Sequence, residues 1–214
     1  ARLAGAHPSC PFLIRGEHRG DTFQGKAEFG DVNVGETPFT VQGLLRRGTK
    51  LNLGYGNGTL SFFSVRSQAI YGIRHTLGMT HDQDNQIIGG SAGFSLPGIR
   101  TEIKATYLTG EDSSDLAYGI SGIENGLRTG DVSSLRITSQ IIPTILAVDF
   151  EAAYSRYDFD DADEFDEVSD TAWRVDFSGT VKQYTYDLKY EYIGRDFESI
   201  AVQGGTKDRE GIYF

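Results

Sequence analysis

The sequence is poor in cysteine, tryptophan and methionine, with one of each, and has only five prolines among 214 residues. The single thiol, Cys10, allows no disulfide within the chain and excludes a CxxC redox motif or a zinc site built from several cysteines. No stretch approaches the roughly 18 consecutive apolar residues of a membrane-spanning helix. Lysine and arginine number 20 against 30 acids, and this net charge of −10 has the wrong sign for binding nucleic-acid phosphates. We therefore expect no nucleic-acid partner.

Glycine and aromatic residues are frequent instead. The chain has 27 glycines, 11 tyrosines and 13 phenylalanines, yet hydrophobic residues make up only 38%, below the ~45–50% of ordinary globular proteins. A wall with apolar side chains on one face and water on the other has this kind of composition. The length suits a single domain over residues 1–214, and no linker divides it.

Alternating apolar and polar residues are the main pattern of the chain. The clearest case is 173–181, where a two-residue period indicates a β-strand and fits no helix. Residues 184–192 repeat the pattern, and the two runs predict an antiparallel hairpin that turns at Lys182 and Gln183. The apolar face of this hairpin contains Trp173, Val175, Phe177, Tyr184, Tyr186, Leu188, Tyr190 and Tyr192.

The same period predicts further strands, about ten to twelve in all, with a bulge near Tyr157. Several are close to the ~9–11 residues that a tilted strand needs to cross a bilayer. Short connections alternate with long polar ones, as periplasmic turns and outer loops do in membrane barrels. The predicted fold is all-β, an antiparallel up-and-down transmembrane β-barrel. The other expected strands are 12–19, 23–34, 39–45, 50–55, 59–65, 88–96, 103–107, 135–141 and 146–154.

Several loop and turn motifs resemble those of large, poorly characterised, porin-like outer-membrane β-barrel proteins of Gram-negative bacteria. The motifs are Phe29-Gly30-Asp31-Val32-Asn33-Val34-Gly35-Glu36-Thr37-Pro38, Leu45-Arg46-Arg47-Gly48, Tyr107-Leu108-Thr109-Gly110, and the segments 190–200 and 207–211. The resemblance covers most of the chain and implies a place in the bacterial outer membrane, in contact with lipid and lipopolysaccharide. It carries over no active-site residues.

The C-terminal residues depart from this family. Such barrels usually finish with a strand that alternates back from a C-terminal Phe, and here Phe214 and Ile212 fit the pattern while Glu210 and Asp208 do not. The resemblance therefore implies that 210–214 begins another strand. We expect the chain to be a segment of a larger barrel, whose first and last strands need further strands or other subunits as partners.

Two groups of residues are candidate sites. Polar residues opposite the apolar faces are expected to line the pore, namely Arg136, Arg174, Asp176, Asp187, Lys189 and Glu191. The acidic stretch 158–167 offers oxygen ligands for Ca²⁺ through Asp158, Asp160, Asp161 and Asp163, but it lacks the glycine and spacing of an EF-hand. A solvated, self-repelling outer loop is the plainer interpretation of that stretch.

The predicted function is a passive channel, or a membrane anchor for a surface or secretion assembly, with no enzymatic activity. No strand-to-helix turn is expected that could present a serine on a nucleophile elbow, and no helix is expected that a phosphate-binding loop could open. No cofactor other than Ca²⁺ is expected. The alternative is a soluble extracellular β-sandwich or β-roll that binds glycan or Ca²⁺ through acidic loops. A sandwich buries its large aromatics at mid-strand, whereas a barrel places them at the lipid headgroups.

Overall fold

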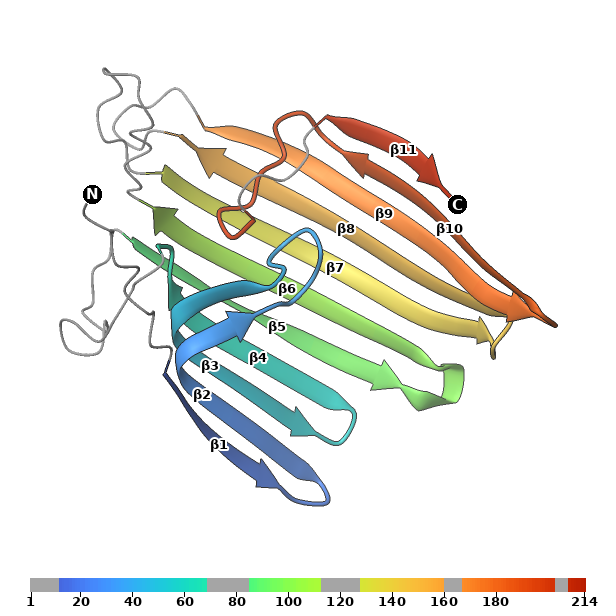
Figure 1. Ribbon diagram of the computed structural model, residues 1–214, viewed down its shortest axis with the longest axis horizontal. Coiled ribbons are helices and arrows are strands. Elements are labelled where there is room, and N and C mark those ends of the chain that lie inside the picture. The colour runs from blue at the N-terminus through green and yellow to red at the C-terminus, as the bar shows by residue number, and fades with distance from the viewer. Residues whose placement is uncertain (1–11, 69–84, 113–127, 160–166, 203–207) are drawn as a thin grey trace, which may run out of the picture.

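The computed structural model describes residues 12–68, 85–112, 128–159, 167–202 and 208–214. Its eleven strands form one antiparallel sheet in which every strand pairs with its neighbours in sequence (Figure 1). The all-β, up-and-down prediction and the expected number of strands are confirmed. A 3-10 turn, η3 (Pro97–Ile99), follows β5, and no helix in these ranges is long and apolar enough to cross a membrane. The strands are β1 (Leu13–Arg19), β2 (Phe23–Val34), β3 (Leu44–Tyr55), β4 (Gly58–Arg66), β5 (Gln86–Leu96), β6 (Thr101–Asp112), β7 (Arg128–Ile142), β8 (Leu146–Asp158), β9 (Val168–Val181), β10 (Tyr184–Ile193) and β11 (Arg209–Tyr213).

Short and long connections lie at opposite ends of the sheet, as the sequence predicted. Because consecutive strands are antiparallel, the short connections after odd-numbered strands share one end, here called the turn end. The long connections after even-numbered strands share the other, called the loop end. The turn-end connections are 20–22, 56–57, 97–100, 143–145 and 182–183, and the loop-end connections are 35–43, 67–85, 113–127, 159–167 and 194–208.

Two local predictions were wrong. Residues 39–43, expected to begin a strand over 39–45, instead form a turn in which the Thr40 amide donates to the Thr37 carbonyl, and β3 runs unbroken from Leu44. The bulge expected near Tyr157 is absent because Tyr157 keeps the alternation and is buried, so β7 and β8 pair without interruption there. The register of this pair shifts at the turn end instead, between Gln140 and Ile142.

The described sheet is open. β1 and β11 lie at its two edges and do not pair with each other, so closure into a barrel is not seen, and the described residues form no second, stacked sheet. Because the number of strands is odd and neighbouring strands are antiparallel, β1 and β11 point in the same direction. Both run from the loop end to the turn end.

Two loop-end connections fold back over one face of the sheet. The connection after β2 (blue) and the connection after β10 (red) both lie across the strands in Figure 1. Residues 35–43 and 194–202 are together called the strap. The strap face of the sheet is called the inner face, and the opposite one the outer face.

Candidate functional site

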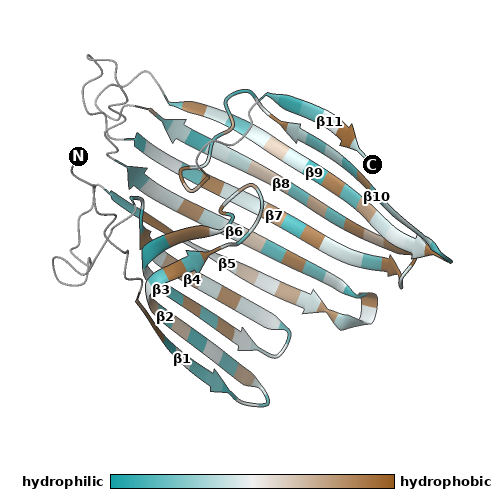
Figure 2. Cartoon of the chain, in the orientation of Figure 1, coloured by the Kyte–Doolittle hydropathy of each residue, from teal (hydrophilic) through white to brown (hydrophobic). Residues whose placement is uncertain are grey.

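The outer face is apolar over its turn-end half. Neighbouring strands place one residue each in a register row that contains no charged side chain: Leu53, Leu60, Ala92, Ala105, Leu135, Ala152, Trp173 and Tyr192. The larger of these side chains remain exposed, including Leu60 at 58% and Leu135 at 43%, because no described segment covers them. Figure 2 shows the resulting alternation of brown and teal residues along the strands.

Aromatic side chains lie on this apolar surface and are not buried between layers. The Trp173 ring packs against Tyr190 and Tyr192, with centroid distances of 4.8 and 6.4 Å. Tyr184 and Tyr55 are exposed at the turn end. Rings at both limits of an exposed apolar surface are the arrangement found where protein meets lipid headgroups.

The outer face becomes polar toward the loop end. The Arg156 guanidinium and the Asp131 carboxylate, on neighbouring strands β8 and β7, form an ion pair of 2.8 Å there. Arg47 and Asp31 form a second pair of 3.0 Å on β3 and β2. The apolar surface therefore ends before the strands do.

The inner face carries the charges over the turn-end half. All six predicted pore-lining residues share this face, because each lies out of phase with the apolar row: Arg136, Arg174, Asp176, Asp187, Lys189 and Glu191. That they share one face agrees with the expected alternation. The described sheet is open, so these strands alone do not enclose the face.

Ion pairs link these charges across neighbouring strands. The Arg136 Nε donates to Asp149 at 2.8 Å, and the Arg174 guanidinium lies 3.1 Å from Asp149 and 3.3 Å from Glu151. The Glu151 side chain is fully buried, at 0% exposure. On β10, Lys189 pairs with its own strand neighbour across one residue, Glu191. The inner charges are thus largely compensated within the wall.

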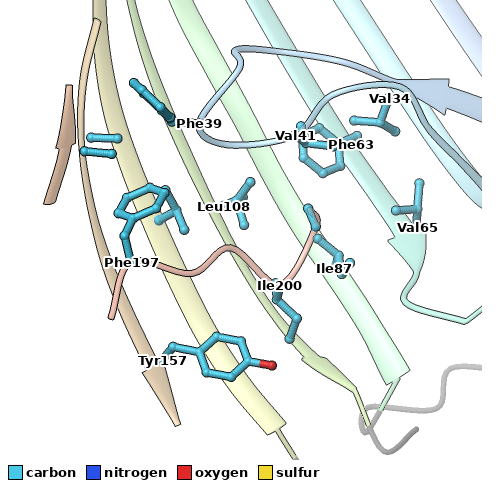
Figure 3. Packing of buried hydrophobic residues seen from close by; sticks show 14 of the residues in the cluster. Val34, Phe39, Val41, Phe63, Val65, Ile87, Leu108, Tyr157, Phe197 and Ile200 are labelled. Atoms are coloured by element: carbon cyan, nitrogen blue, oxygen red, sulfur yellow. The ribbon is translucent and has the colours of Figure 1, made fainter. Parts of the chain in front are cut away.

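The inner face turns apolar toward the loop end, where the outer face turns polar. Phe63, Ile87, Leu108 and Val132 come from four consecutive strands and are at most 1% exposed (Figure 3). Each of these four strands thus reverses its polarity along its length. Reversal brings apolar residues next to each other in sequence, as at Phe62-Phe63, Ile87-Ile88 and Tyr107-Leu108. These adjacent apolar residues are the sequence signal of the reversal, because strict alternation would place a polar residue beside each of them.

The strap covers the apolar part of the inner face. Phe39 and Val41 of its first segment, with Phe197 and Ile200 of its second, complete the buried cluster (Figure 3). The Phe39 and Phe197 rings meet edge to face, with centroids 5.9 Å apart. The two segments, which come from opposite flanks of the sheet, therefore touch over its middle.

Glu36 fixes the first strap segment to the wall. Its carboxylate accepts hydrogen bonds from the Ser61 hydroxyl at 2.6 Å and the Ser91 hydroxyl at 2.7 Å, and it forms an ion pair of 2.7 Å with the Lys104 ammonium. The Lys50 ammonium lies 3.8 Å away. The Glu36 side chain is only 2% exposed, so four strands of the wall surround one carboxylate.

Burial and these partners act on the pKa of Glu36 in opposite directions. Burial alone raises the pKa, because it disfavours the charged form. The hydrogen bonds from Lys104, Ser61 and Ser91, with the charge of Lys104, favour the carboxylate and outweigh burial, so the pKa lies below its usual 4.5. Glu36 is therefore ionised when the strap is seated.

Glycines make room for the rings beneath the strap. A Cβ on Gly89 would lie 2.6 Å from the Phe63 ring and 2.8 Å from the Leu108 Cβ, closer than atoms approach. The Phe63 ring thus occupies the space above β5 that any side chain at this position would fill. Gly89 therefore has a packing role within its strand.

A polar hollow lies beside the strap, toward the β1 edge. Its volume is about 580 Å³, and its lining alternates cations with acids: Lys26, Lys50, Lys104, Glu17, Glu36 and Glu102. Mixed charge of this kind suits water and small hydrophilic solutes.

The predicted Ca²⁺ ligands are mostly beyond the described part of the chain. Asp158 ends β8, whereas Asp160, Asp161 and Asp163 fall in 160–166, outside the described residues. Among the residues that are described, no cluster of three or more His, Cys, Asp or Glu side chains is placed to hold a metal ion. The Ca²⁺ prediction stays untested.

Comparison with protein families, with curated proteins and with solved structures finds no match to this chain.

Proposed function

We propose that the chain forms part of the wall of an outer-membrane β-barrel, which encloses a polar lumen and acts as a channel or as the anchor of a surface assembly. Its partners are outer-membrane lipid and lipopolysaccharide on the outer face. The proposal includes no chemistry, because the charged inner residues are paired with one another and not arranged around a reacting group.

The single observation that carries the proposal is the polarity of the turn-end half. There the outer face exposes Leu60, Phe62 and Leu135, while Arg136 and Arg174 point to the other side. In water such a surface would associate or aggregate, since soluble monomers rarely expose large contiguous apolar patches. In a bilayer it is the lipid-facing surface of a barrel, and the opposite face is the water-filled side.

The polar residues at the loop end of the outer face limit how much of the sheet can lie within the membrane. Asp131 and Arg156 lie on the outer face beyond the apolar row, where hydrocarbon would disfavour them, whereas the Arg47 side chain paired with Asp31 is only 1% exposed. We infer that the loop-end part of the wall projects from the membrane. Its polarity there, apolar inside and polar outside, is that of an ordinary water-soluble protein.

Closure needs strands beyond those described. Backbone groups at an open edge cannot remain unpaired in hydrocarbon, so the β1 and β11 edges require partners. Because β1 and β11 run in the same direction, pairing them directly would give a parallel pair. An entirely antiparallel barrel therefore needs an odd number of additional strands, and a ring of copies joined β11 to β1 does not satisfy this.

Site-directed spin labelling tests the proposal with neighbouring residues. Leu135→Cys and Arg136→Cys are made separately in the complete protein, each with Cys10→Ser, and carry a nitroxide on opposite faces of β7. In the outer membrane, the Leu135 label should relax with oxygen, which dissolves in lipid. The Arg136 label should relax with a water-soluble nickel complex.

A label at Asp131→Cys serves as the depth control, because this residue is on the same face as Leu135 but within the polar rim. It should be accessible to the nickel complex. Equal accessibility of the Leu135 and Asp131 labels to the aqueous reagent would contradict the lipid-facing wall and favour a soluble sheet.

A further inference from the structure

We propose that the strap blocks the lumen along the described wall, and that Glu36 is the latch that holds it there. The inference rests on the proposed barrel and concerns the regulation of its lumen. An open channel needs a continuous wetted path along its inner face. Here that path ends where the strap begins.

The strap spans the middle of the sheet and is attached on its way. Glu36 contacts β4, β5 and β6 through Ser61, Ser91 and Lys104. The Thr37 hydroxyl then lies 3.1 Å from the Ser134 hydroxyl of β7, and the Phe39 amide donates to the Glu151 carboxylate of β8 at 3.4 Å. The first segment thus crosses five consecutive strands.

The second segment meets the first from the other flank. The Glu198 amide donates to the Ser155 hydroxyl of β8 at 3.2 Å, and the Ser199 hydroxyl donates to the Thr40 carbonyl at 2.6 Å. With the Phe39 and Phe197 rings in contact, the two segments form one continuous bridge. A bridge anchored at both flanks blocks more of the lumen than either loop alone.

Part of the contact between the strap and the sheet is apolar and buried. Val41 of the strap and Phe63, Leu108 and Val132 of the sheet are 0% exposed. Water and ions do not enter an apolar space of this kind, since each would lose its hydrogen bonds. A solute that enters the polar hollow from the turn end therefore reaches a closed apolar layer.

The attachment of the strap is polar although its core is apolar. The buried Glu36 carboxylate is the strap group with the most wall partners, and releasing it requires separating an ion pair and two hydroxyl hydrogen bonds. One other strap contact described above involves a charged group, the bond from the Phe39 amide to the Glu151 carboxylate. Loss of the Glu36 charge is thus the single change that most loosens the strap while the strands stay unaltered.

The register offers a clean way to remove the first segment. Val34 and Leu44 are direct partners across β2 and β3, so residues 35–43 can be replaced by Asn-Gly, the preferred two-residue hairpin turn, without shifting either strand. Single-channel conductance of the complete protein in planar bilayers is then compared with this variant. We expect a several-fold rise. Thr185→Ala, a neutral change at the turn end away from the strap, is the matched control and should conduct like the parent.

A milder variant covers the case in which the hairpin replacement does not fold. Glu36→Ala keeps every strap residue but removes the latch, and it should raise the frequency of high-conductance openings several-fold. A disulfide between Thr40→Cys and Ser199→Cys, with Cys10→Ser, should suppress those openings in the Glu36→Ala protein until a reductant is added.

The outcomes separate this inference from the proposed barrel. If the Leu135 label stays exposed to lipid while the parent, hairpin and Glu36→Ala proteins conduct alike, or none of them conducts, the blocking strap is wrong and the membrane wall stands. If the Leu135 label is not in lipid, the proposed function itself fails.

Discussion

The Ser199 hydroxyl donates a 2.6 Å hydrogen bond to the Thr40 carbonyl, although 159 positions separate the two residues in sequence. Both residues are buried, and this contact joins connections from the two flanks of the sheet. A long-range contact of this kind orders two loops at once. Removal of this hydrogen bond should therefore destabilise both segments of the strap.

Ser199→Ala should lower the free energy of unfolding by about 1–3 kcal/mol, because the Thr40 carbonyl is left buried without its donor. Urea unfolding of the membrane-reconstituted protein measures the change. Ser169→Ala, an exposed serine on β9, should alter stability by less than about 0.5 kcal/mol. Equal effects of the two substitutions would show that the strap is not seated on this bond.

Glu36→Gln should lower the free energy of unfolding at neutral pH and make that free energy less dependent on pH. The folded-state pKa of Glu36 lies below 4.5, so its carboxylate stabilises the fold above about that pH, and this contribution is lost as the pH falls through the lower folded-state pKa. We expect a loss of about 2 kcal/mol at pH 7.

The check for Glu36 is the difference in unfolding free energy between parent and Glu36→Gln, measured from pH 7 down to pH 3. The difference should shrink as the medium becomes more acidic, because protonation deprives the parent of the same charge. A difference that stays constant over this range would exclude the carboxylate as the origin of the effect.

Gly89→Ala should destabilise the fold by about 1–3 kcal/mol, since the new methyl group meets the Phe63 ring and Leu108 at once. Gly16→Ala on β1 is the matched control, because a Cβ there has nothing within 4 Å. Thermal unfolding distinguishes the two. A Gly89→Ala protein as stable as Gly16→Ala would mean that the rings beneath the strap are not packed as described.

Arg174→Met should cost about 3–5 kcal/mol, because it leaves the fully buried Glu151 carboxylate without its cation. Arg156→Met removes a guanidinium of similar geometry from the outer rim, but that side chain is 52% exposed, so the expected loss is below about 1 kcal/mol. Denaturant titrations of both variants provide the comparison. A larger loss of stability for Arg156→Met than for Arg174→Met would mean that the outer ion pair, and not the inner one, is buried.

The strands were predictable because their two-residue period depends on local sequence alone. Arg136, Arg174 and Lys189 were assigned to one face correctly, since each is flanked by apolar residues of the opposite phase. The strap was not predicted. Residues 39–45 alternate like a strand, and only contacts with distant residues, such as Glu36 with Lys104 and Phe39 with Phe197, fold them inward.

The reversal of polarity along the strands was not predicted from the sequence either. Alternation averaged over a whole strand assigns each residue to one of two environments, whereas Phe62 and Phe63 are adjacent and both apolar because one faces outward and the other lies beneath the strap. What covers a face depends on residues elsewhere in the chain. The pairs of neighbouring apolar residues nevertheless mark the level at which this happens.

Strand direction also limits how such a wall can grow. Hairpins are added or lost two strands at a time, so duplications of this kind leave both borders of an eleven-stranded sheet pointing the same way. In the proposed barrel, whole hairpins added at a border of this sheet would therefore never close the ring with antiparallel pairs, and one unpaired strand must come from elsewhere in the protein or from another subunit.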